Sequence, residues 1–161
     1  MTPDLTMARL RAEEALGVRE VRCLGTVHAP LAAAFARAAG IEEEQYVDPT
    51  REDFAVHPLY LPSMLRGHQG GEDADYRSDG MFADEVPGTR GLTVRLMAGG
   101  QTLDFVRDPV VGESVDAVRT LDAVTVKGRA DAPWLLLEVA KEYVSSGVGI
   151  LAYVRESFIV R

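Results

Sequence analysis

Histidine and carboxylate side chains near the middle of the chain are best suited to proton transfer. His57 precedes an apolar segment, and Asp48 and Asp53 lie shortly before it. An imidazole oriented by a carboxylate can act as a general base near neutral pH, because its unperturbed pKa is about 6.5. His57 and Asp48 are therefore the candidate catalytic residues, with Asp53 as a second orienting group. The alternatives are a histidine with one structural hydrogen bond, and an Asx turn formed by Asp48 with Thr50.

A second candidate feature is the sequence Gly99-Gly100-Gln101. Paired glycines let the backbone approach a ligand closely, so that an N–H group can polarise a substrate carbonyl. The same residues are also typical of a β-bulge at the start of a strand. Both interpretations remain open at this point.

The elements that position these residues begin with helices. Residues 1–16 are expected to form a polar helix or arm, followed by a strand from Val18 to Val27. Pro30 suits the first turn of a helix, and Gly40 suits its end. The apolar stripe expected on this helix consists of Leu31, Ala34, Phe35 and Ala38.

The segment between the helices and the later strands is less regular. Pro58 to Arg66 predicts a short apolar helix that Pro62 interrupts. Residues 67–90 are rich in Gly, Asp and Glu and predict a flexible loop, either a lid over a ligand site or a disordered segment.

The C-terminal half reads as an antiparallel meander. Alternating apolar residues and short turns predict strands at 101–107, 114–127, 134–144 and 149–160. A single curved sheet needs helices to cover its apolar face, which predicts an α+β fold. A small antiparallel sheet wrapped around a central helix is the hotdog fold. We expect one domain over residues 1–161 and a dimer, because open edge strands tend to be paired.

Composition excludes several classes of protein. The 161 residues carry a formal net charge of −8, which argues against nucleic-acid binding. No apolar stretch is long enough to cross a membrane and no signal peptide is recognisable, so a cytoplasmic location is expected. The single cysteine, Cys23, lies in an apolar strand and is expected to be buried. We expect no metal site and no cofactor.

Short motifs in this order resemble the MaoC-like hydratase and dehydratase family, specifically its FAS1-like dehydratase N-terminal hotdog domain. The motifs are Ala36-Arg37-Ala38-Ala39-Gly40, His57-Pro58-Leu59-Tyr60-Leu61, Ala98-Gly99-Gly100-Gln101 and Arg107-Asp108-Pro109-Val110-Val111-Gly112-Glu113. The resemblance covers roughly residues 17 to 161. It implies a substrate that is an acyl-CoA or acyl carrier protein thioester. It also implies substrate-binding roles for Tyr46, His57, Tyr60, Gly99, Gly100 and Gln101.

The departures from the family pattern concern catalysis. Active members have an aspartate after the glycine and a histidine five residues later, and this dyad activates water for addition to an enoyl thioester. Here Ile41 stands at the aspartate position, Tyr46 at the histidine position and Glu43 at the asparagine position. Many members work as two hotdogs, of which one has lost the dyad and accommodates the acyl group. The resemblance therefore implies the non-catalytic, acyl-binding half of a heteromeric enoyl-CoA hydratase.

Other functions remain open. The chain could be a self-sufficient dehydratase or lyase of a specialised pathway in which His57 has replaced the dyad, working as a homodimer. A hotdog thioesterase would need a carboxylate on or just before the central helix, and only Asp53 is near. A pure acyl-thioester binding module is the remaining alternative. The partner would be a catalytic hotdog in a heterodimer or heterotetramer.

Overall fold

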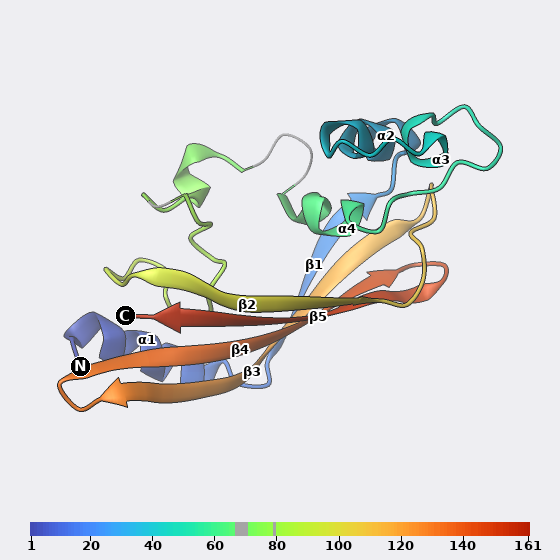
Figure 1. Cartoon of the computed structure of the whole chain (residues 1–161). Helices are drawn as coiled ribbons and strands as arrows, with labels where there is room; N and C mark the ends of the chain where they lie inside the picture. The colour runs from blue at the N-terminus through green and yellow to red at the C-terminus, as the bar shows by residue number, and fades with distance from the viewer. Residues whose placement is uncertain (67–70, 79) are drawn as a thin grey trace.

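A five-stranded antiparallel sheet forms the body of the protein (Figure 1). The computed structural model describes residues 1–66, 71–78 and 80–161. The strands lie in the order β1-β3-β4-β5-β2, so β1 and β2 are the edges. Their bounds are β1 Arg19–Thr26, β2 Leu96–Phe105, β3 Ser114–Arg129, β4 Ala132–Ser145 and β5 Gly149–Val160. The predicted meander is confirmed for β3, β4 and β5. The strand predicted at 101–107 is instead the edge strand β2, which begins at Leu96 and pairs with β5 and not with β3.

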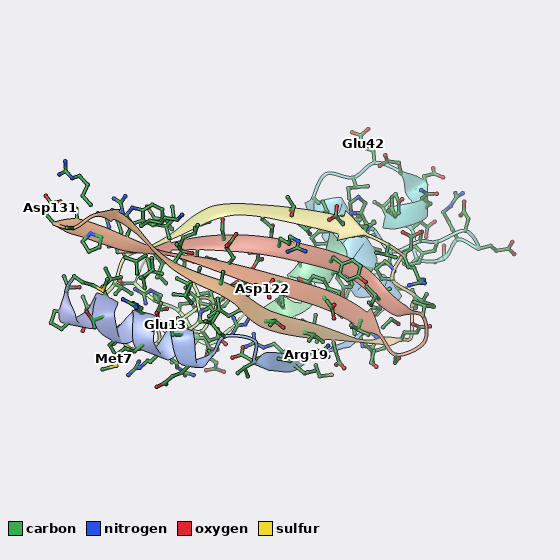
Figure 2. The ribbon with its side chains drawn as sticks, turned by 90° about the horizontal axis from the view of Figure 1, so that it is seen from below. Met7, Glu13, Arg19, Glu42, Asp122 and Asp131 are labelled. Carbon is green, nitrogen blue, oxygen red and sulfur yellow. The ribbon has the colours of Figure 1, made fainter. Side chains whose placement is uncertain are left out.

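The helices lie at the two ends of the long strands. Figure 1 shows α1 at the end near both termini, and α2, α3 and α4 at the opposite end. Figure 2 shows the same division, with Met7 and Glu13 on α1 near the β3–β4 hairpin and Glu42 at the far end beside α2. Their bounds are α1 Pro3–Glu14, α2 Ala29–Ala38, α3 Glu44–Val47, α4 Tyr60–Ser63, and the 3-10 helices η1 Met64–Arg66 and η2 Asp73–Asp75.

One face of the sheet carries almost all buried side chains. In β4 the buried residues alternate strictly, from Leu135 through Leu137 and Val139 to Tyr143, as the sequence predicts. In β5 the alternation of the sequence predicts that Ile150 is buried. The register against β4 shifts between Tyr143 and Val144, and Leu151 is buried instead. Extra residues of this kind are β-bulges, and they bend a strand. We call this face the inner face.

The inner face carries two apolar cores. The first core lies under α1 and comprises Leu5, Ala8, Ala12, Val86, Val94, Leu96, Leu121, Leu135, Leu137, Val139, Phe158 and Val160. The second core lies under α2 and α4 and comprises Val27, Ala32, Val56, Tyr60, Leu61, Met64, Val115, Ala117, Tyr143, Leu151, Ala152 and Val154. Residues 1–16 are therefore anchored on the sheet by a helix.

Helix α2 uses a different face from the predicted stripe. Its buried residues are Ala32, Ala33 and Ala36. Alanine has the smallest side chain that still favours a helix, so this face lets the backbone lie close to its neighbours. The stripe of Leu31, Ala34, Phe35 and Ala38 instead remains half-buried or exposed.

The expectation that Cys23 is buried is wrong. Cys23 is exposed, and Val21 on the same strand is 66% exposed. Successive residues of a strand point to opposite faces. In β1 the register places Glu20 and Arg22 opposite the inner-face residues Arg119 and Ala117, so Val21 and Cys23 face the uncovered outer side.

The described part of the predicted 67–90 loop packs onto the sheet and α1. Residues 67–70 and 79 lie outside the described residues. Beyond them, the rings of Tyr76 and Phe82 lie 4.6 Å apart, Val86 joins the first core, and Thr89 is fully buried. This part of the chain covers the inner face between the two cores. A lid role for it remains a prediction.

The fold is α+β and of the hotdog type. Helix α4 and η1 lie over the second core, and Pro62 lies inside the single α-helical turn of α4, which a 3-10 turn follows. None of the helices in the described ranges is long and apolar enough to cross a membrane.

Candidate functional site

The loop expected to hold the catalytic pair begins where α2 ends. Gly40 has a φ of 74°, and the N–H groups of Gly40 and Ile41 donate to the carbonyl oxygens of Arg37 and Ala36. This is a Schellman motif, in which glycine takes the left-handed conformation at the helix end. The motif fixes the backbone of Ile41, the residue that the motif resemblance aligns with the aspartate, and an isoleucine side chain can neither hold nor transfer a proton.

Tyr46 and His57 form a close aromatic pair. Their ring centroids lie 5.1 Å apart at an interplanar angle of 81°, which is an edge-on arrangement. Nδ1 of His57 accepts a hydrogen bond of 3.3 Å from the backbone N–H of Leu59. This bond favours the neutral tautomer that carries its proton on Nε2.

The two carboxylates expected to orient His57 are engaged elsewhere. Oδ1 of Asp48 accepts from the hydroxyl of Thr50 at 2.7 Å and from its N–H at 3.0 Å, and these bonds lower the pKa of Asp48. Asp53 forms a two-bond pair with Arg51, with N–O distances of 2.7 and 3.0 Å, and this pair lowers the pKa of Asp53. The Asx-turn interpretation of Asp48 therefore describes its geometry, and no carboxylate pairs with His57 in the described part of the chain.

Tyr60 lies in a separate groove on the other side of this helical cluster. Its ring packs edge-on against Phe35 with centroids 5.8 Å apart, and burial raises the pKa of its phenol. The groove has a volume of about 600 Å³. Its lining is mostly apolar and comes from β1, α2, α4 and η1: Leu24, Gly25, Thr26, His28, Leu31, Ala34, Phe35, Ala38, Tyr60, Ser63 and Met64.

The small side chains of α2 keep this groove open. Ala34 and Ala38 are four residues apart, so they lie above one another on one helical face. Pockets of about 300–1,000 Å³ with apolar walls and few polar groups are typical small-molecule sites. The groove is therefore the best-formed candidate for an apolar ligand among the described residues. Of the predicted substrate-binding residues, it contains Tyr60 alone.

Gly99, Gly100 and Gln101 lie on the edge strand β2. The register of β2 against β5 shifts between Ala98 and Gly100, so Gly99 is the extra residue of a β-bulge. A Cβ atom on Gly99 would lie 2.7 Å from Oγ of Ser157, which explains the glycine sterically. These residues are not brought together with the Tyr46–His57 pair or with the groove lining.

A row of polar side chains crosses the inner face between the two apolar cores. We call it the polar belt, and it consists of Glu20, Arg119, Lys141, Glu156 and Gln101, one from each strand. Nε of Arg119 donates to Glu20 at 2.9 Å, Nζ of Lys141 lies 2.6 Å from Oε2 of Glu156, and Nε2 of Gln101 donates to Oε1 of Glu156 at 2.6 Å. The Lys141 side chain is only 5% exposed and that of Glu156 only 9%.

Two acidic residues from the segment that follows residue 80 form ion pairs beside this belt. Asp84 accepts from Arg22 at 2.5 Å, and Glu85 accepts from Lys141 at 3.2 Å. Nη1 of Arg119 donates to the backbone carbonyls of both residues. A cavity of about 140 Å³ lies here, lined by Glu20, Val21, Arg22, Leu65, Glu85, Ala117, Arg119 and Lys141.

Sequence reasoning missed the polar belt, although a signal was present. Lys141 falls in phase with the buried residues Val139 and Tyr143, and Glu156 falls in phase with Val154 and Phe158. A charged residue in phase with a buried row is unusual, because burying an ion is costly unless it is paired. No group of three or more His, Cys, Asp or Glu side chains suited to a metal occurs within the described ranges.

Comparison with known structures identifies the fold. The chain superposes on a chain of the ChsH1-ChsH2 complex from Mycobacterium tuberculosis with a TM-score of 0.65 and 15% sequence identity. The match covers 97% of this chain and 90% of the other. A MaoC-like dehydratase from Phytophthora capsici gives 0.62 at 14% identity over 94% of this chain, which spans about half (48%) of that longer chain. The R-hydratase PhaJ1 from Pseudomonas aeruginosa gives 0.60 at 13% identity, over 89% of this chain and 79% of the other.

These likenesses place the chain among the MaoC-like hotdog proteins in fold. The resemblance drawn from the short motifs is thus confirmed at the level of structure. No protein-family profile matches the sequence. No curated protein matches it either.

Proposed function

We propose that this protein is the acyl-binding, non-catalytic half of a heteromeric hotdog hydratase or dehydratase acting on enoyl or 3-hydroxyacyl thioesters. The observation that carries the proposal is the state of the catalytic loop. The motif resemblance aligns Ile41 and Tyr46 with the dyad positions, and His57 has no carboxylate partner in the described structure and accepts a hydrogen bond at Nδ1. Hydration needs a group that accepts a proton from water near neutral pH.

The groove supports the acyl-binding part of the proposal. Its volume of about 600 Å³ and its apolar walls suit a long or bulky acyl group. The shortness of α4 and η1 leaves room beside α2 that a long central helix would fill. A partner hotdog that carries the dyad would supply the catalytic groups, and a similar chain occurs in the two-protein ChsH1-ChsH2 complex.

The first test is hydration of enoyl-CoA thioesters of increasing acyl length by the purified chain, followed by loss of the conjugated thioester absorbance. We expect no turnover above the uncatalysed rate, together with measurable acyl-CoA binding by calorimetry. Turnover by the chain alone that disappears in His57→Ala would instead establish the self-sufficient enzyme.

The binding site is tested by filling the groove. Ala34→Leu places three more carbon atoms in the groove and should weaken acyl-CoA binding by about tenfold or more. Ala39→Leu is the matched control, because Ala39 is exposed on the same helix end and does not line the groove. Equal affinity in both variants would place the acyl group elsewhere.

A further inference from the structure

We infer that Lys141 and its cavity bind an oxygen atom at the far end of the acyl group, so that the substrates are oxygenated acyl thioesters rather than plain fatty acyl thioesters. The inference rests on the proposed function and assigns its substrate class. The site is the cavity of about 140 Å³ over the polar belt.

The cavity lies next to the apolar groove along the chain, and no described residue lines both spaces. Met64 of η1 lines the groove, and the next residue, Leu65, lines the cavity. On β1, Leu24 lines the groove and Arg22 lines the cavity. Two residues of a strand span about 6–7 Å, so the two spaces lie end to end along β1 and η1. A ligand whose apolar body fills the groove therefore points its far end at the cavity.

Lys141 provides the donor in this cavity. An ammonium group has three N–H donors. Within the described part of the chain, Glu85 accepts one at 3.2 Å, and Oε2 of Glu156 lies 2.6 Å away as an ion-pair partner without hydrogen-bond geometry. A further N–H is available to a ligand, and the side chain is only 5% exposed, so little water competes for it.

The charge around the cavity selects a neutral oxygen over an anion. Arg22, Arg119 and Lys141 are matched by the carboxylates of Glu20, Asp84, Glu85 and Glu156, which bind them directly. Each of these described cations already has a carboxylate partner, with which a carboxylate or phosphate ligand would have to compete. A hydroxyl or keto oxygen needs only the donor. A hydrocarbon end would instead cover the ammonium and leave this N–H without an acceptor, which is costly for a buried polar group.

The polar belt is also difficult to explain by stability alone. Replacing a buried ion pair by well-packed apolar residues is often neutral or stabilising. The apolar cores on either side of the belt show that this sheet can bury such residues throughout. A ligand-binding role accounts for charges placed where the sheet would otherwise be apolar.

The test compares ω-hydroxyacyl-CoA thioesters, from octanoyl to hexadecanoyl, with the unsubstituted thioester of each length. Binding is measured by calorimetry on the full chain. We expect the hydroxylated ligand to bind about tenfold more tightly at the length whose end reaches Lys141, because a hydrogen bond to a charged group contributes about 1.5–3 kcal/mol. The preference should disappear in the double variant that combines Lys141→Met with Glu156→Gln. It should persist in the control variant Lys127→Met, which removes the other lysine of the chain, at an exposed strand end.

Leu65→Phe serves as a second variant that leaves every ion pair intact and narrows the cavity, and it should lose the preference as well. Equal or tighter binding of the unsubstituted thioester at every length overturns the inference and leaves the proposed function standing. A preference that survives in both the double variant and Leu65→Phe overturns it too. Absence of binding by every thioester overturns the proposed function itself, and the inference with it.

Discussion

Removal of the Lys141 ammonium should destabilise the fold strongly, although the residue lies outside both apolar cores. In Lys141→Met the apolar stem is kept and the charge is lost. The side chain of Glu156 is only 9% exposed. In this variant it keeps the hydrogen bond from Gln101 but loses the Lys141 ammonium, which lies 2.6 Å away in the wild type. Breaking a buried ion pair from one side costs about 3–5 kcal/mol, because an uncompensated charge stays buried.

A double-mutant cycle separates the ion pair from general packing. Glu156→Gln added to Lys141→Met removes the uncompensated carboxylate, so the double variant should recover a large part of the lost stability. The assay is equilibrium urea unfolding followed by circular dichroism, with the change taken from the midpoint at an unchanged m value. Lys127→Met is the control, and as an exposed substitution it should stay within about 0.5 kcal/mol of the wild type. A loss below about 1 kcal/mol for Lys141→Met, or no recovery in the double variant, would refute the assignment of a buried pair.

Three further outcomes are expected. Burial raises the pKa of Tyr143, and nearby carboxylates add to the effect, so the folded state keeps this proton longer than the unfolded chain. Stability should therefore fall as pH rises above about 10, the unfolded value, and Tyr143→Phe should flatten urea midpoints measured between pH 9 and 11. Gly88→Ala should lower the free energy of unfolding by about 2 kcal/mol or more, measured by thermal unfolding, because Gly88 has a φ of 80° and a Cβ atom there would lie 2.8 Å from the backbone of Ala12. A neutral effect would contradict this contact with α1. Cys23 should react with a thiol reagent in the folded protein as fast as in urea, and slow labelling would contradict its exposure on β1.

The sequence by itself determined the main features of the fold. The alternation of Leu135, Leu137 and Val139 in β4 fixed which face of that strand is buried, because a strand has a two-residue period. Gly40 and Pro62 likewise marked the end of α2 and the interruption of the central helix, because each residue restricts the backbone locally. The prediction that the dyad is missing also came from residue types, since Ile41 cannot carry a proton in any arrangement.

The tertiary structure decided everything that depends on distant neighbours. Whether Cys23 is buried depends on what covers the outer face of β1, and nothing in a strand pattern contains that information. Asp48 and Asp53 lie close to His57 in sequence, yet each has a nearer partner in space.

The candidate sites depend on the same kind of information. The groove exists because α2 packs through Ala32, Ala33 and Ala36 and leaves its larger apolar stripe beside β1 and α4. The polar belt exists because five separate strands each contribute one polar side chain. Glu20, Arg119 and Lys141 lie opposite one another, Glu156 lies opposite Gln101, and Lys141 and Glu156 are diagonal neighbours. The register between strands sets that alignment, and register is a property of the assembled sheet and its bulges.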